Sequence, residues 1–195
     1  MSMLERGFKS WSERLSAGIR RELSVAPHDP LDPRSLANYL EVTLWTPSDV
    51  RGIPEEILAQ LLDKDPRGWS AVTQTVGDRT VVIYNPRHSR GRQASNITHE
   101  LAHIILDHEP GKIMFSHDGS IVMRTFDAKQ EDEAGWLSGC LLLPRLALLS
   151  ALRRGESSED ISKAYGVSEM LVRYRISLCG VAAQVRAADR RQRRP

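Results

Sequence analysis

The sequence is poor in cysteine and has no long hydrophobic run. Only two of its 195 residues, Cys140 and Cys179, are cysteines, and each stands beside a leucine, which is typical of buried free thiols in a reducing compartment. Residues 1–21 carry charges throughout and lack the apolar core of a signal peptide. No apolar stretch approaches the length that spans a bilayer. We therefore expect a cytoplasmic protein without a membrane segment.

The body of the chain also lacks a strong net charge. The formal net charge of the whole chain is +2, whereas residues 186–195 contain five arginines and one aspartate and so carry +4, which leaves −2 on the rest. We predict that residues 186–195 form a basic disordered tail. An arginine-rich tail is compatible with nucleic-acid contact, but we favour a solvated terminus and do not favour DNA as a partner.

Hydrophobic spacing divides the chain into units. A composition of 41% hydrophobic and 27% charged residues is ordinary for a globular protein of this length. Apolar residues at spacings of three to four predict an amphipathic helix over residues 3–23, and a proline-rich connection follows. The predicted units are an N-terminal helix at 1–26, a main domain at 27–150, a C-terminal module at 151–185 and the tail at 186–195.

The main domain is predicted to be α+β, mainly helical with a small antiparallel sheet. Residues 69–76 and 79–84 are strand-like, and Gly77-Asp78 between them predicts a hairpin, because glycine adopts the positive φ of tight turns. A second strand pair is expected around residues 113–115 and 121–123. The other expected elements are a strand at 41–45 and helices at 34–40, 54–62, 91–107, 131–143 and 145–154.

The segment His99-Glu100-Leu101-Ala102-His103 has the spacing of a zinc-peptidase motif. On an α-helix, residues four apart lie on one face, so His99 and His103 can bind the same metal ion. Glu100 lies close enough to act on a water at that metal without being a ligand. Apolar neighbours such as Ile97 and Ile104 indicate a partly buried helix, which favours a metal site over two chance surface histidines.

A third metal ligand must come from elsewhere, since a catalytic zinc ion usually has three from the protein. His108 lies about 140° round the helix from His103, too far to reach the same metal unless the helix has ended, and we interpret it as structural or as a support for the ligands. The acids that begin the next helix are better placed. We favour Glu131, which shares a face with small residues, and keep Glu133, which shares a face with apolar residues, as the alternative.

Residues 156–180 have the layout of a helix-turn-helix motif. Gly166 is expected to end the first helix and Ser168 to cap the second. On the second helix, Arg173 and Arg175 can face DNA. Acids outnumber bases in this segment, however, and DNA affinity depends largely on neutralising phosphates. We therefore favour a two-helix packing unit over a DNA-contacting or repressor-contacting module.

The sequence resembles the ImmA/IrrE family of bacterial and phage metallopeptidases. HELAHIILDH at residues 99–108 is similar to the first motif of the family, and EDEAGWLSGCLLLPR at residues 131–145 is similar to the second. The similarity extends from about Asp29 to Gly180, which is most of the chain. Gly135 departs from the pattern, since the family often has Asn or Asp there, and this leaves open what supports the ligand histidines.

The resemblance implies a gluzincin-like zinc peptidase core in residues 27–150. It implies one zinc ion held by His99, His103 and Glu131, with Glu100 as catalytic acid/base; manganese is the alternative metal. Family members are similar in acting on helix-turn-helix repressors, so the resemblance implies a protein substrate of that type.

These features together predict a regulatory zinc-dependent endopeptidase that uses zinc-activated water, with Glu100 as general base. The strand at 79–84 is expected to pair with an extended substrate backbone. The candidates for stabilising the oxyanion are Tyr84, Arg92, His108, His117 and Arg124. The alternatives are a DNA-binding or repressor-binding regulator with a non-catalytic metal site, and a toxin-antitoxin partner that binds without cutting.

Overall fold

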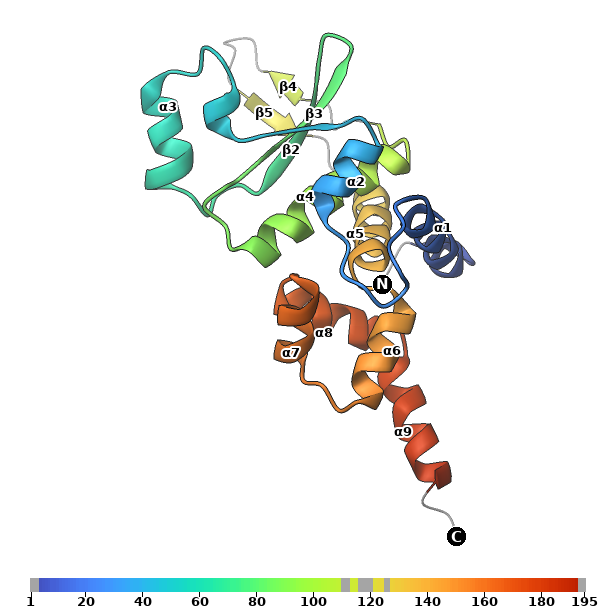
Figure 1. Ribbon diagram of the computed structural model, residues 1–195. Coiled ribbons are helices and arrows are strands. Elements are labelled where there is room, and N and C mark those ends of the chain that lie inside the picture. The colour runs from blue at the N-terminus through green and yellow to red at the C-terminus, as the bar shows by residue number, and fades with distance from the viewer. Residues whose placement is uncertain (1–3, 110–112, 116–120, 125–126, 193–195) are drawn as a thin grey trace.

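The computed structural model has the predicted mainly helical α+β fold and describes residues 4–109, 113–115, 121–124 and 127–192 (Figure 1). The helices are α1 (Phe8–Glu22), α2 (Pro33–Tyr39), α3 (Glu55–Ala59), α4 (Arg90–Ile105), α5 (Ala128–Leu142), α6 (Arg145–Arg153), α7 (Ser158–Tyr165), α8 (Glu169–Leu178) and α9 (Val181–Gln192), with short helical turns η1 (Pro47–Asp49) and η2 (Gln60–Lys64). The strands are β1 (Thr43–Trp45), β2 (Ala71–Val76), β3 (Arg79–Tyr84), β4 (Ile113–Phe115) and β5 (Ile121–Arg124).

The larger sheet has the strand order β1-β3-β2, so β3 lies in the middle. The predicted hairpin of β2 and β3 forms, with Gly77 at a φ of 62° in the turn and Thr73 opposite Val82. β1 runs parallel to β3, which makes this sheet mixed, whereas β4 and β5 form the expected antiparallel pair. Because β3 has a strand on each side, the expectation that it pairs with a substrate is wrong. The edge strand of the hairpin is β2.

The first hydrophobic core lies where α4 and α5 pack together, with α1 and α2 beside them (Figure 1). Leu36 of α2, Leu101 of α4 and Leu137 of α5 are fully buried there, and Val82 of β3 joins them. The sheet and the motif-bearing helix are therefore held by the same core, which fixes their relative position.

The end of α5 and the helices after it form a second hydrophobic core. Its members come from α5 to α9 and include Leu142, Leu148, Ile161, Val172 and Val181. The change from one core to the other falls between Leu141 and Leu142, within the unit that we predicted for residues 27–150. α6 packs its apolar face against the C-terminal helices.

Helices α7 and α8 have the predicted helix-turn-helix layout. Gly166 ends α7 at a φ of 62°, and the Ser168 side chain caps α8. Arg175, which we expected to be able to face DNA, is instead fully buried and paired with Glu13 of α1. Arg173 is exposed but forms an ion pair one turn back along α8. The second helix is thus a packing element on the side that carries Arg175.

Both ends of the chain differ from the prediction. α1 begins at Phe8 rather than at residue 3, because Gly7 adopts a left-handed φ of 95°. The prediction of a disordered tail from residue 186 is wrong for residues 186–192, which continue α9. Val181 anchors this helix in the second core, and the alanines and arginines that follow have high helix propensity. Residues 193–195 lie outside the described residues.

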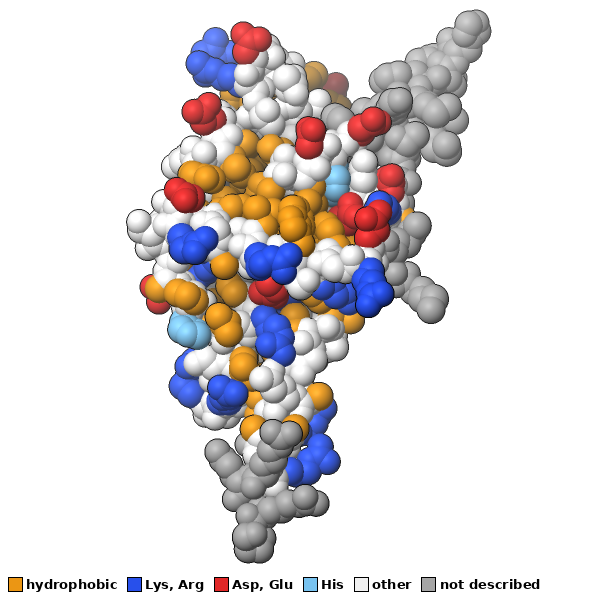
Figure 2. All heavy atoms as spheres, turned by 90° about the vertical axis from the view of Figure 1, so that its right-hand side faces the viewer, with side chains coloured by type: hydrophobic (Ala, Val, Ile, Leu, Met, Phe, Trp, Pro, Cys, Tyr) orange, Lys and Arg blue, Asp and Glu red, His pale blue; other side chains and the backbone are white. Residues whose placement is uncertain are grey.

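The surface differs between the two halves of the molecule. Figure 2 shows hydrophobic side chains gathered in the upper half of this face and basic side chains across its middle and lower part. Within the described residues, no single helix has both the length and the hydropathy to cross a membrane. In the part of the chain that the structure describes, α5 and α6 taken together, with a bend of 55° between them, meet those criteria, but most of α5 is buried in the fold.

Candidate metal centre

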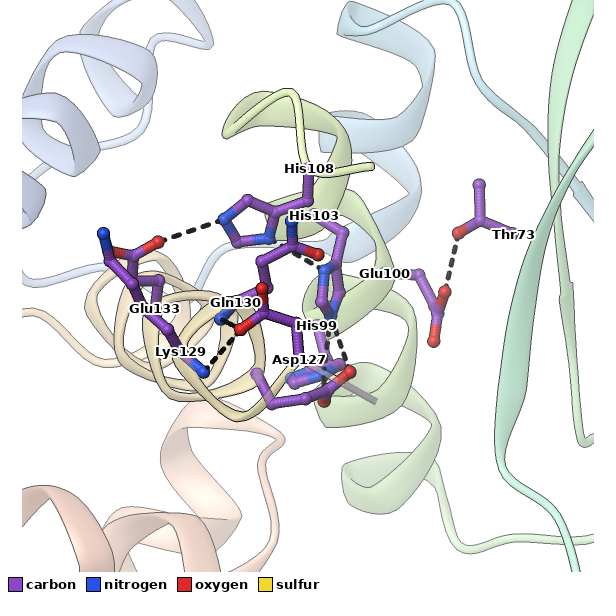
Figure 3. A network of polar contacts seen from close by, with 10 residues as sticks. Thr73, His99, Glu100, His103, His108, Asp127, Lys129, Gln130 and Glu133 are labelled. Atoms are coloured by element: carbon purple, nitrogen blue, oxygen red, sulfur yellow. Dashed lines mark hydrogen bonds and ion pairs between the residues drawn. The ribbon is translucent and has the colours of Figure 1, made fainter. Parts of the chain in front are cut away.

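The two motif histidines lie on a different side of α4 from the buried Ile97 and Leu101. The Ser89 side chain caps the start of α4, and Ile97 and Leu101 bury one side of the helix. His99 and His103 project from the other side, towards α5 (Figure 3), with side chains that are 30% and 19% exposed. Helix periodicity alone produces this separation of faces.

Helix α5 brings one carboxylate to these imidazoles. One oxygen of Glu131 lies 3.0 Å from His99 Nε2, and the other lies 3.5 Å from His103 Nε2. The two Nε2 atoms are 3.1 Å apart. Glu131 stands in the first turn of α5, which begins at Ala128 rather than at the expected residue 131. The structure thus places Glu131, and not the alternative Glu133, beside the histidine pair.

The arrangement of His99, His103 and Glu131 fits a small divalent metal ion. Zinc bonded at about 2.0–2.2 Å in a tetrahedral arrangement requires ligand atoms about 3.3–3.6 Å apart. Here the three ligand atoms lie within 4.8 Å of one another. Two imidazole nitrogens and one carboxylate oxygen are also a common donor set of catalytic zinc. All three side chains are partly exposed.

Glu100 lies on the side of α4 that faces the larger sheet (Figure 3). Its Oε2 atom accepts a hydrogen bond of 2.6 Å from Thr73 Oγ1 on β2. This bond ties the carboxylate to the hairpin, and Glu100 is not among the three possible ligands. Sequence reasoning missed Thr73, because the contact joins residues 27 positions apart and arises only when the hairpin packs on α4.

His108 and Glu133 form a second polar group next to the histidine pair (Figure 3). α4 ends at Ile105, and Asp107 takes a left-handed φ of 52°, so the chain turns back on itself. His108 Nδ1 thereby comes to 2.9 Å from His103 Nδ1, and His108 Nε2 lies 3.3 Å from Glu133 Oε2. We expected Glu133 to point towards apolar packing; it contacts this imidazole instead.

Position 135, where the sequence departs from the family pattern, has open space for a side chain. An added Cβ on Gly135 would meet no atom within 4 Å. The contact to the second nitrogen of His103 comes from His108.

The residues that we predicted as candidates for stabilising the oxyanion have different surroundings. Tyr84 is buried and its hydroxyl accepts a hydrogen bond of 2.9 Å from an arginine of α2. Arg92 lines an open cavity of about 590 Å³ beside the first turn of α4. His108 touches the histidine pair. His117 and the side chain of Arg124 lie outside the described residues.

Comparisons with known proteins add a family and a fold. Residues 58–177 match the family model described as the IrrE N-terminal-like domain, a span that contains α4, α5 and the helix-turn-helix layout. The fold is similar to that of a Mycobacterium tuberculosis transcriptional regulator, with a TM-score of 0.51 and 14% sequence identity. That match covers 89% of this chain and 47% of the regulator, so the chain spans about half its length. A comparison with curated proteins finds no significant match.

Proposed function

Because the chain belongs to the IrrE N-terminal-like peptidase family, whose model matches residues 58–177, we propose that it is a regulatory zinc-dependent endopeptidase. The metal ligands are His99, His103 and Glu131, and the catalytic residue is Glu100. The observation that carries the proposal is the convergence of two imidazole nitrogens and one carboxylate from two different helices. An intact Glu100 beside them is needed for hydrolysis but not for a purely structural metal.

The donor set favours zinc, one ion per chain, with manganese as the alternative. Zinc bound there would supply Lewis acidity, which would polarise the scissile carbonyl and make a water molecule more acidic. His99 and His103 would hold the ion through their Nε2 atoms, which lie 3.1 Å apart, and Glu131 would neutralise part of its charge.

Glu100 moves the proton in this reaction. Its carboxylate takes a proton from the attacking water and delivers it to the leaving amine. The hydrogen bond from Thr73 to Oε2 leaves Oε1 to face the reacting water. A carboxylate that is oriented before the substrate arrives loses less entropy when the reaction begins.

The substrate lies along β2 in an extended conformation. β2 pairs with β3 on one side, and its other side is the edge of the larger sheet. Thr73 of β2 contacts Glu100, so this strand lies next to the proposed general base. Backbone hydrogen bonds to a sheet edge bind an extended peptide with little dependence on its sequence, which leaves specificity to side-chain contacts outside the strand.

The substrate class we propose is an intracellular helix-turn-helix repressor. The resemblance of the two motifs to the regulatory ImmA/IrrE peptidases supports this class, and the similar fold of a transcriptional regulator is compatible with it. The rival function, a DNA-binding regulator, is weakened because Arg175 is buried in an ion pair and does not reach the surface.

Metal analysis and cleavage assays on two variants test the proposal. The Glu131→Gln variant is expected to lose bound zinc. The Glu100→Gln variant is expected to keep one zinc per chain while cleavage of a purified helix-turn-helix repressor falls by about 10²–10⁴-fold, the range that general acid–base catalysis supplies. Glu109→Gln is the matched control, since it makes the same chemical change at an exposed position after α4. Undiminished cleavage by Glu100→Gln, or undiminished zinc in Glu131→Gln, would contradict the proposal.

A further inference from the structure

We infer that Glu133 and His108 form a hydrogen-bonded relay that holds His103 in the form protonated at Nδ1 and so turns its Nε2 lone pair towards the metal position. This inference rests on the proposed function, because it gives His103 the role of a ligand. It assigns His108 and Glu133 as positioning residues, which act on the metal only through His103.

The order of donors and acceptors follows from the carboxylate at the end of the chain of contacts. A carboxylate can only accept, so the 3.3 Å contact between Glu133 Oε2 and His108 Nε2 requires a proton on that nitrogen. A neutral imidazole carries one N–H, and His108 Nδ1 must then be an acceptor. The 2.9 Å contact between the two Nδ1 atoms therefore places the proton on His103 Nδ1. A neutral His103 then has its lone pair on Nε2, 3.5 Å from Glu131 Oε1, and this pairing is favourable once the proposed cation is bound by both atoms.

The opposite order is unfavourable at both ends. A proton on His108 Nδ1 alone would leave a lone pair on Nε2 facing the carboxylate of Glu133. It would also require an acceptor at His103 Nδ1, and the proton of His103 would then occupy Nε2, where it blocks metal binding. Only one arrangement of the neutral rings satisfies both contacts and leaves the ligand atom open.

Burial and the local backbone keep the relay in place. The side chains of His108 and Glu133 are 7% and 14% exposed, both less than His99 or Glu131, so water competes weakly for their hydrogen bonds. The His108 backbone N–H donates to the His103 carbonyl at 3.0 Å, which ties the turn after α4 to the ligand it supports. Lys129 Nζ lies 3.9 Å from the other oxygen of Glu133 and places a cation on its second side.

The first readout is the protonation pattern of His108, observed by nitrogen–proton NMR on metal-free protein with isotope-labelled histidine. At about pH 8, His108 is expected to carry its proton on Nε2, the nitrogen that contacts Glu133. The Glu133→Ala variant is expected to lose that preference. A proton on Nδ1 of His108 in the wild type, or an unchanged pattern in Glu133→Ala, overturns the relay.

The second readout is zinc affinity, measured by competition with a chelator. Loss of a partner that orients a metal-ligating histidine weakens binding by about 10–100-fold, and this loss is expected for His108→Phe and for Glu133→Ala. Glu133→Gln should recover most of the affinity, because its amide oxygen still accepts from His108 Nε2. Glu109→Ala, which truncates an exposed acid beside His108, should bind zinc as the wild type does. Circular dichroism of each variant checks that it is folded.

The two readouts separate the relay from the proposed function. If the wild type binds zinc and the His108 and Glu133 variants bind it equally well, the relay is wrong and the peptidase proposal stands. If the wild type binds no zinc while His108 keeps its proton on Nε2 under the control of Glu133, the relay stands and the peptidase proposal fails.

Discussion

Glu13 of α1 and Arg175 of α8 form a buried ion pair, and removing its acidic member should destabilise the whole fold. The Arg175 side chain is fully buried, and it donates from Nη2 to Glu13 Oε1 and from Nε to the Leu143 carbonyl at 3.2 Å. Burial by itself lowers the pKa of Arg175, but the neighbouring thiols and Glu13 more than offset this and hold the pKa above its ordinary value. The guanidinium therefore stays charged inside the protein.

The size of the effect follows from the charge that is left behind. Breaking a buried ion pair by removing one partner costs about 3–5 kcal/mol, because the other charge stays buried without compensation. In Glu13→Leu that charge is Arg175, whose Nη1 atom already has no hydrogen-bond partner among the described residues. A fold of this kind is stable by about 5–15 kcal/mol in total. At about 2–4 °C per kcal/mol for this chain length, the Tm should fall by roughly 6–20 °C.

Urea unfolding and thermal unfolding, both followed by circular dichroism, measure the loss. The double variant Glu13→Leu/Arg175→Met replaces both charges by apolar groups and should recover most of the stability. Arg173→Met is the matched control, since it removes an exposed arginine that is paired on the same helix and should cost less than about 1 kcal/mol. If Glu13→Leu changed the unfolding free energy no more than Arg173→Met, or if the double variant were as unstable as Glu13→Leu, the reasoning about the unpaired charge would be refuted.

Two further predictions concern backbone packing and acid stability. Gly91→Ala should destabilise the fold by about 1–3 kcal/mol in urea unfolding, because the added Cβ would lie 2.6 Å from the Val167 carbonyl carbon. Gly18→Ala is the control: its Cβ would have no atom within 4 Å, and it should stabilise α1 by about 0.5–1 kcal/mol. Equal effects of the two substitutions on the unfolding free energy would contradict the close approach at Gly91. Burial lowers the pKa of His88, so its contribution to stability is present above the unfolded pKa of about 6.5 and is lost as the pH falls through the folded pKa. Unfolding at about pH 7.5 and pH 5.5 should show this acid loss in the wild type and in the exposed-site variant His28→Asn, but a smaller loss in His88→Asn.

Much of the fold could be predicted from local sequence. The hairpin of β2 and β3 was predicted because Gly77 can adopt the positive φ of its turn, and the structure has a φ of 62° there. Gly166 and Ser168 mark the end of α7 and the start of α8 for similar local reasons. Element boundaries were less certain, since α5 begins three residues before the expected start and α9 continues into the expected tail.

The sequence by itself determined that His99 and His103 lie one turn apart on one face of a helix, because that follows from helical geometry alone. Only the tertiary structure decided which acid joins them. Glu131 and Glu133 lie on the same helix, and their sequence positions describe their directions around α5 but not the angle at which α5 meets α4. Packing turns Glu131 to the histidine pair and Glu133 to His108. It likewise brings Thr73 to Glu100 and buries Arg175, since contacts between distant segments depend on how whole elements pack and not on local propensity.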